Sequence, residues 1–218
     1  MRSIYKIVVC SLLTLSITSC EKDLLEKEQY QKEIYLIGAY NRVWTTEVSY
    51  SNEEVKTYFT VSSSGTLALD RDVNVKMKIN EELVDIYNKK YWTVLNEDKY
   101  YKSLDTDLYS IPSLENTVIK HAEGISTEVP VLIKTASLKI DQSYVIPVEI
   151  ESTTGYPVST SGYKMLVLLK LKNEYSGSYQ MSGHTTLEGE TPKTIQKPKT
   201  IKPTGVNTCL LYTSPSPR

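Results

Sequence analysis

The feature that most constrains the fold is a run, Val73–Ile79, in which apolar and polar side chains alternate strictly. Every odd position of this run is apolar and every even position is polar. Successive side chains of a strand point to opposite faces, so a period of two predicts a strand with one face on a core and the other in water. The chain is therefore expected to build a sheet that buries one side.

Similar patterns recur along the chain and predict an all-β fold. Short strands separated by turn residues roughly every 10–15 positions are typical of an immunoglobulin-like antiparallel β-sandwich. Met165–Leu169 is apolar at every position, which predicts a central strand, whereas Pro130 and Pro147 predict strand edges or bulges. The remaining strand patterns lie at residues 34–37, 43–48, 55–61, 117–121, 128–134, 144–151 and 163–172.

One short helix is expected directly after the alternating strand. Asn80 is a good capping residue, acidic residues follow it, and residues 83–87 supply an apolar side. The polar, tyrosine-rich stretch Tyr91–Ser113 has little periodicity and predicts a long excursion over one end of the domain. Loops of this length are commonly functional.

The N-terminus reads as a lipoprotein signal. Arg2 and Lys6 precede a short apolar run that ends in Thr18-Ser19-Cys20, an order that resembles the lipobox of bacterial lipoproteins. We expect residues 1–19 to be a signal peptide, Cys20 to carry the lipid and residues 20–31 to be a tether. The lipid anchor predicts an outer-membrane protein, and the charged residues 21–23 resemble a surface-export signal.

The composition changes twice near the C-terminus. The predicted sandwich spans residues 32–173, and residues 174–208 read as the truncated start of a second β-rich domain, expected to be disordered because a lone strand has no partner. Residues 209–218 resemble translated sequencing-library adaptor, and this resemblance predicts that the natural protein is longer.

Several classes of function find no support in the sequence. Between residues 21 and 208 there is no cysteine, and His121 and His184 lack metal-ligand spacing, so no metal site or cofactor is expected. The chain has 26 acidic and 25 basic residues without a basic block, which argues against nucleic acid as a partner. Paired carboxylates such as Asp105 and Asp107 read as solvated surface charges, and no catalytic residue is predicted.

Three segments together resemble a known family. The helix-start motif at residues 84–88, the strand region 138–152 and the closing strand 163–172 are similar to the N-terminal β-sandwich domain of unknown function of Bacteroidetes surface lipoproteins. The resemblance covers about residues 33–173. It implies a β-sandwich that precedes a lipocalin-like C-terminal domain or, in some relatives, a family-eighteen endoglycosidase barrel. It implies no catalytic residues.

Aromatic residues provide the best candidates for binding. The chain has 17 tyrosines and two tryptophans but one phenylalanine, a bias toward rings with a polar group that suits wet interfaces and sugar stacking. The alternative is that such rings are core or half-buried residues, and Trp44 is expected in the core. The candidate ligand-binding residues in and near the excursion are Tyr91, Trp92, Tyr100, Tyr101 and Tyr109.

Three functions remain open. The first is a non-catalytic surface lipoprotein that assists glycan binding or adhesion to a host surface, alone or with other outer-membrane glycan-uptake proteins. The second is an N-terminal spacer in a truncated glycoside hydrolase. The third is a structural or assembly component without a ligand. A panel of glycans, with Trp92, Tyr100 and Tyr101 replaced by alanine, distinguishes the first from the third.

Overall fold

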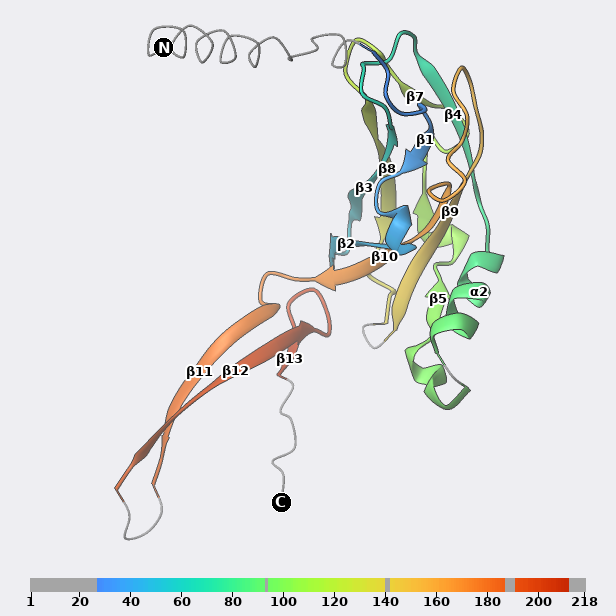
Figure 1. Cartoon of the computed structure of the whole chain (residues 1–218). Helices are drawn as coiled ribbons and strands as arrows, with labels where there is room; N and C mark the ends of the chain where they lie inside the picture. The colour runs from blue at the N-terminus through green and yellow to red at the C-terminus, as the bar shows by residue number, and fades with distance from the viewer. Residues whose placement is uncertain (1–26, 93, 140–141, 187–190, 212–218) are drawn as a thin grey trace, which may run out of the picture.

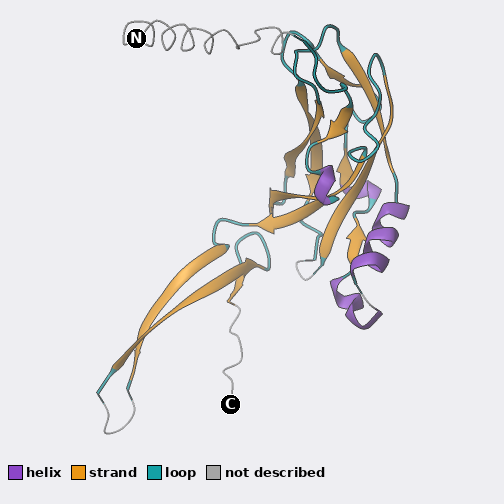
Figure 2. Cartoon of the chain, in the orientation of Figure 1, coloured by secondary structure: helices purple, strands orange, loops and turns teal. Residues whose placement is uncertain are grey.

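The computed structural model describes residues 27–92, 94–139, 142–186 and 191–211, and it is mostly β-sheet (Figures 1 and 2). Residues 1–26, and with them the predicted signal peptide and Cys20, lie outside the described residues. The described elements are β1 (Ile34–Leu36), η3 (Ala39–Asn41), β2 (Val43–Ser49), β3 (Glu54–Ser63), β4 (Val73–Ile79), α2 (Glu82–Tyr91), η4 (Val94–Lys99), β5 (Tyr101–Ser103), η5 (Thr106–Leu108), β6 (Tyr109–Ser110), β7 (Thr117–Ile119), β8 (Ser126–Lys134), β9 (Ser143–Thr153), β10 (Lys164–Lys172), β11 (Gly177–Thr185), β12 (Lys193–Pro203) and β13 (Cys209–Leu211).

Two sheets pack face to face and confirm the predicted all-β sandwich. The first sheet has the order β1-β3-β8-β6, and the second has the order β2-β10-β9-β4-β7 with β5 added on β9. Most strand pairs are antiparallel, as predicted, but β2 pairs with β10 and β5 pairs with β9 in parallel. Both exceptions arise where a short segment enters the second sheet beside a strand that is distant in sequence.

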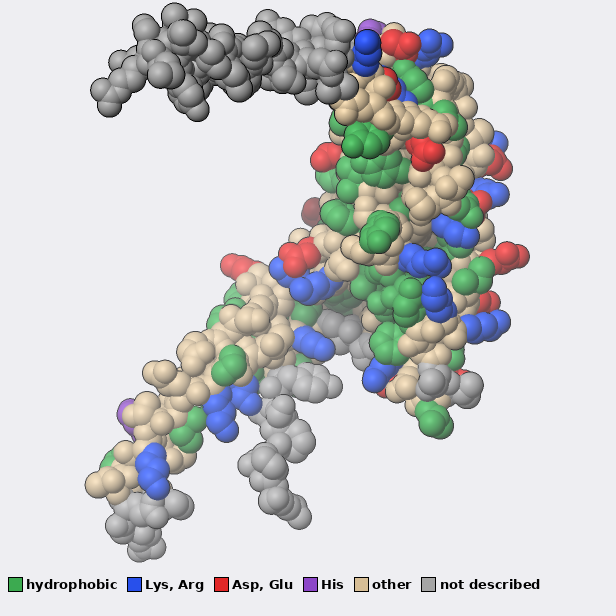
Figure 3. Space-filling view, in the orientation of Figure 1, with side chains coloured by type: hydrophobic (Ala, Val, Ile, Leu, Met, Phe, Trp, Pro, Cys, Tyr) green, Lys and Arg blue, Asp and Glu red, His purple; other side chains and the backbone are tan. Residues whose placement is uncertain are grey.

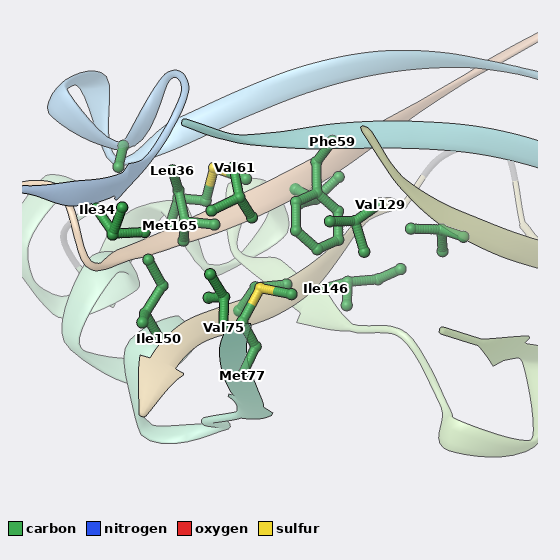
Figure 4. Packing of buried hydrophobic residues seen from close by; sticks show 14 of the residues in the cluster. Ile34, Leu36, Phe59, Val61, Val75, Met77, Val129, Ile146, Ile150 and Met165 are labelled. Atoms are coloured by element: carbon green, nitrogen blue, oxygen red, sulfur yellow. The ribbon is translucent and has the colours of Figure 1, made fainter. Parts of the chain in front are cut away.

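The core lies between the two sheets (Figure 4). The alternation in β4 holds as predicted, since Val73, Val75 and Met77 are buried while the polar residues between them are exposed. Phe59 is 1% exposed and is the largest fully buried side chain. Burying such a side chain contributes about 1.5–3 kcal/mol relative to leaving it in water.

Strand β10 is central, as its apolar sequence predicts, because it lies between β2 and β9. Met165, Val167 and Leu169 face the main core. The opposite face of β10 carries Leu166, which packs with Val145 and with two residues of α2 in a second, smaller cluster. Both faces of this strand are therefore apolar because one meets the other sheet and the other meets the helix.

Helix α2 begins at Glu82, and its N-cap residue is Glu81 rather than the expected Asn80. The Asn80 side-chain oxygen accepts a hydrogen bond from the Glu82 N–H at 3.2 Å, while its amide donates to a Glu149 carboxylate oxygen at 2.6 Å. The helix ends after Lys89 and Lys90, whose charges favour the negative end of the helix. Leu83 and Val84 are buried against β9 and β10, which fixes the helix on the outer face of the second sheet.

The chain passes from one sheet to the other through a short turn around η3. Gly38 and Arg42 flank this turn with φ angles of 89° and 63°. Glycine adopts the left-handed region at little cost, but arginine rarely does. Trp44 follows on β2 and is 38% exposed, so the expectation that it lies in the core is wrong. It lies on the edge strand of the second sheet, with its ring against Gly38.

Each of the two prolines has a paired strand on one side only. Pro130 lies opposite Tyr58 of β3, and on its other side it lies beyond the short ladder between β8 and β6. Pro147 belongs to the interior strand β9 and lies opposite Leu166 of β10, while on its other side it lies between the segment paired with β5 and the segment paired with β4. Proline is tolerated in a strand where the neighbouring ladder is interrupted, because it has no N–H to donate.

The C-terminal segment forms a third sheet that extends away from the sandwich (Figure 1). Residues 174–208 were expected to be disordered, and in the part that the structure describes β11 pairs with β12 along its whole length. Most side chains of this hairpin are exposed, so backbone pairing is its main support. Strand β13 pairs with β12 and begins at Cys209, inside the segment that resembles adaptor sequence.

Candidate functional site

An open cleft of about 430 Å³ lies where the turn between the sheets, the start of β10 and helix α2 meet. It combines aromatic rings, aliphatic side chains, hydroxyl groups and two cations. Its lining residues are Ala39, Tyr40, Arg42, Leu83, Ile86, Tyr87, Thr160, Ser161, Tyr163, Lys164, Met165 and Leu166.

The turn between the sheets forms one wall of this cleft. The Arg42 N–H donates to the Ala39 carbonyl at 2.9 Å, and the Arg42 carbonyl accepts from the Leu166 N–H at 2.8 Å. These two hydrogen bonds fix the backbone of Arg42 between η3 and β10. Tyr40 lies at the centre of the turn and is 90% exposed. A ring this exposed contributes little to packing and is free to contact a ligand.

Helix α2 forms the opposite wall. Leu83 is buried and anchors the helix, whereas Ile86, one turn later, is 52% exposed in the cleft. Residues three or four positions apart share a face of a helix, so the same face that packs on β10 also presents Ile86 and Tyr87 to the cleft. On this face, Leu83 therefore supports the fold, whereas Ile86 is accessible to a ligand.

The charge in the cleft has a single sign, because Arg42 and Lys164 line it and no aspartate or glutamate does. The Lys164 ammonium lies 4.8 Å from the centre of the Tyr163 ring. Lys and Arg side chains gather beside hydrophobic side chains on the face over β10 and α2 (Figure 3).

A stack of three tyrosines adjoins the cleft through Tyr87. Its ring centre lies 5.2 Å from that of Tyr101, with the two planes 10° apart, and 4.5 Å from that of Tyr91. Burial, with a further contribution from Tyr101, raises the pKa of Tyr87 to about 12, so this phenol is neutral at physiological pH. Asn88 holds the stack together because its side-chain amide donates to the Tyr101 carbonyl and accepts from the Tyr101 N–H, both at 2.9 Å.

The structure separates the five aromatic residues that the sequence singled out. Tyr91 and Tyr101 lie on either side of Tyr87. Trp92 is half-buried at the end of α2, with the Lys99 ammonium 5.7 Å from its ring. Its buried indole nitrogen has no hydrogen-bond partner among the described residues. Tyr100, next to this group, is half-buried.

Tyr109 lies apart from the others, on β6 in the first sheet, and packs against the main core. Burial, with a smaller contribution from Glu81, raises its pKa to about 12, and within the described part of the chain its buried hydroxyl has no hydrogen-bond partner. None of the five candidates lines the cleft directly. Their role as ligand-binding residues stays a prediction.

Sequence reasoning missed Tyr40, Tyr87 and Tyr163 as site residues. Tyr87 was assigned to the apolar side of the helix, and Tyr163 to the start of a strand. Only Tyr40 had a visible signal, because it falls in the break between two strand patterns, just after Gly38. The three are distant in sequence, and only the folded chain brings them to one cleft.

A second open cleft, of about 420 Å³, lies between the end of β10 and the strands β11 and β12. Three lysines line it, and two of them, Lys170 and Lys172, share the carboxylate of Glu47 on β2. The carboxylate of Glu47 therefore offsets part of the positive charge there. Among the described residues, no group of three or more His, Cys, Asp or Glu side chains is arranged to hold a metal ion.

Comparison with models of known families identifies the family of the chain. A family model described as an N-terminal domain matches residues 30–157, which is more than half of the chain. The chain belongs to this family. The corresponding C-terminal model matches residues 163–215. The two models meet just before β10, although β10 pairs with strands of the sandwich on both sides. No curated protein matches the sequence.

Solved structures share the fold at low sequence identity. A Bacteroides ovatus protein of unknown function is 19% identical, with a TM-score of 0.63 over 85% of this chain and 63% of its own. A multidomain protein from the same organism that includes the domain of unknown function DUF1735 is 20% identical, with a TM-score of 0.57 over 80% of this chain and 57% of its own. An auxiliary nutrient binding protein from Bacteroides thetaiotaomicron is 15% identical, with a TM-score of 0.58 over 82% and 63% of the two chains. The chain therefore spans about 57–63% of the length of these proteins.

Proposed function

We propose that this chain is the glycan-binding part of a lipid-anchored protein on the outer surface of a bacterial outer membrane. The observation that carries the proposal is the cleft lined by Tyr40, Tyr87 and Tyr163, in which the Tyr87 ring also contacts the rings of Tyr91 and Tyr101. Cys20, outside the described residues, is the proposed lipid attachment site.

The chemistry of the cleft suits a sugar. One face of a pyranose ring carries C–H groups that pack on a flat aromatic ring, and its edges carry hydroxyl groups that need hydrogen-bond partners. Tyr40 and Tyr163 offer rings, and Thr160 and Ser161 offer hydroxyl groups at the rim. A concave site with apolar walls and a few polar groups is the usual form of a small-ligand site.

The sandwich is proposed to be non-catalytic. Glycoside hydrolysis generally requires two carboxyl groups facing each other across the scissile bond. No carboxylate lines the cleft, and the exposed Asp98, Asp105 and Asp107 lie elsewhere. The fold shared with a nutrient binding protein supports a binding role. The proposed partners are a glycan or a host surface, together with other outer-membrane glycan-uptake proteins.

The proposal is tested by measuring glycan binding of the full chain. Calorimetric titration with a panel of neutral and acidic oligosaccharides should reveal a ligand, and Tyr40→Ala should weaken its binding about two- to twelvefold, since an aromatic contact contributes about 0.5–1.5 kcal/mol. Tyr40 is 90% exposed, so its loss should leave the fold intact. Tyr58→Ala is the matched control, because Tyr58 is an exposed ring on the opposite sheet. Absence of binding across the panel, or equal loss with both variants, would refute the proposal.

A further inference from the structure

We propose that the ligand of this cleft is an acidic glycan, one whose sugars carry carboxylate or sulfate groups. The inference rests on the proposed glycan-binding function and adds the chemical class of the ligand. The observation behind it is that both charged side chains in the cleft, Arg42 and Lys164, are cations. The whole chain has a formal net charge of −1, so this local charge is not a consequence of composition.

Lys164 has no carboxylate partner among the described residues. The residue directly opposite it on β9 is Glu149, whose carboxylate would be the natural partner. Glu149 is instead engaged by the Lys78 ammonium at 3.7 Å and by the Asn80 amide at 2.6 Å. The Lys164 ammonium lies over the Tyr163 ring and lines the cleft. Because Lys78 and Asn80 engage the Glu149 carboxylate, the Lys164 ammonium is available to a ligand.

Arg42 is likewise without an ion pair in the part of the chain that the structure describes. Its backbone has a left-handed φ of 63°, which a non-glycine residue adopts at a cost, and hydrogen bonds to Ala39 and Leu166 hold it there. The backbone of Arg42 is thus held by η3 and β10, and Arg42 lines the cleft. Arginine presents a planar set of donors that matches the two oxygens of a carboxylate or sulfate.

The other walls of the cleft do not oppose this charge. On α2, Leu83, Ile86 and Tyr87 line the cleft, whereas the acidic residues Glu82 and Asp85 do not. The hydroxyl groups of Thr160 and Ser161 can accept or donate to sugar hydroxyls. The cleft therefore offers aromatic surface to a sugar ring and two cations to the acidic substituents of that sugar.

The test compares an acidic glycan with a neutral counterpart. Oligosaccharides of polygalacturonate, the same oligosaccharides after reduction of their carboxyl groups, and a sulfated glycan are each titrated into the full chain at low and high salt. We expect the acidic forms to bind at least tenfold more tightly than the reduced form, and this preference to shrink as salt rises. Tight binding of the sulfated glycan alone supports the same anion chemistry and assigns it to sulfate.

Two variants connect the preference to the cleft. Arg42→Asn removes the charge and keeps a residue that tolerates left-handed backbone, and Lys164→Gln removes the second charge. Each should reduce binding of the acidic glycan by about five- to tenfold and binding of the reduced form by a smaller factor. Lys56→Gln is the matched control, because the Lys56 ammonium lies 5.0 Å from the Tyr58 ring on the opposite sheet. Circular dichroism verifies that each variant folds.

The possible failures are distinguishable. Equal affinity for the acidic and the reduced glycan overturns the inference and leaves the proposed function standing. Loss of the preference in Lys56→Gln, or its persistence in both cleft variants, also overturns it. If no glycan binds at all, the proposed function fails and the inference fails with it.

Discussion

Replacing Asn88 by alanine should loosen β5 and disturb the tyrosine stack beside the cleft. Asn88 is 5% exposed, and its amide satisfies both the N–H and the carbonyl of Tyr101, as a neighbouring strand would. Alanine leaves these two backbone groups without partners. A partly buried polar group that loses its hydrogen bond costs about 1–3 kcal/mol.

The expected loss in the free energy of unfolding is therefore about 2–4 kcal/mol. For a chain of this size, each 1 kcal/mol lowers the midpoint of thermal unfolding by about 2–4 °C. Denaturant unfolding followed by circular dichroism measures the global loss, and hydrogen exchange of Tyr101–Ser103 measures the local one. Near-ultraviolet circular dichroism should also change, because the stack of Tyr87 on Tyr101 loses its support.

Asn116→Ala is the matched control, since Asn116 is exposed and its substitution should change stability by no more than about 0.5 kcal/mol. The reasoning is refuted if Asn88→Ala behaves like this control and the amides of β5 keep their protection. It is also refuted if stability falls while the exchange of β5 stays unchanged, because the loss would then arise elsewhere.

Three further perturbations test the fold itself. Phe59→Ala should lower the free energy of unfolding by about 3–5 kcal/mol in a denaturant titration, because it leaves a cavity between the sheets; a loss below about 1 kcal/mol would show that the core collapses around it. Gly38→Ala should destabilise the turn by about 1–2 kcal/mol or more, because φ is 89° and the new methyl would lie 2.6 Å from the Trp44 ring; unchanged thermal unfolding would contradict this. The pKa of Glu28 is lowered to about 2, mainly by hydrogen bonds from the backbone N–H groups of residues 66–67. Because the folded-state pKa is below the ordinary value, this contact should be fully present above about pH 4.5 and lost as the pH falls toward 2. The protection factors of residues 66–67 against hydrogen exchange should fall over that interval, and a profile identical to that of Glu28→Gln would disprove the link.

The sequence by itself determined much of the sandwich. Alternation at Val73–Ile79 fixed which side chains face the core, and the uniformly apolar Met165–Leu169 identified a central strand. Asn80 marked the start of the helix. These features are local, because the periodicity of a strand and the capping of a helix depend on neighbours within a few residues.

The candidate site depended on the tertiary structure. The sequence drew attention to the aromatic residues between Tyr91 and Tyr109, but the fold places Tyr109 on the other sheet and puts Tyr40 and Arg42 beside Tyr163 instead. That meeting arises because the chain changes sheets at η3 and β2 then pairs in parallel with β10. Neither event leaves a periodic signal, because a turn has no repeating pattern and a strand pattern does not name its partner. The physical reason is that strand pairing between distant segments is decided by packing of the whole core, which no local window of sequence contains.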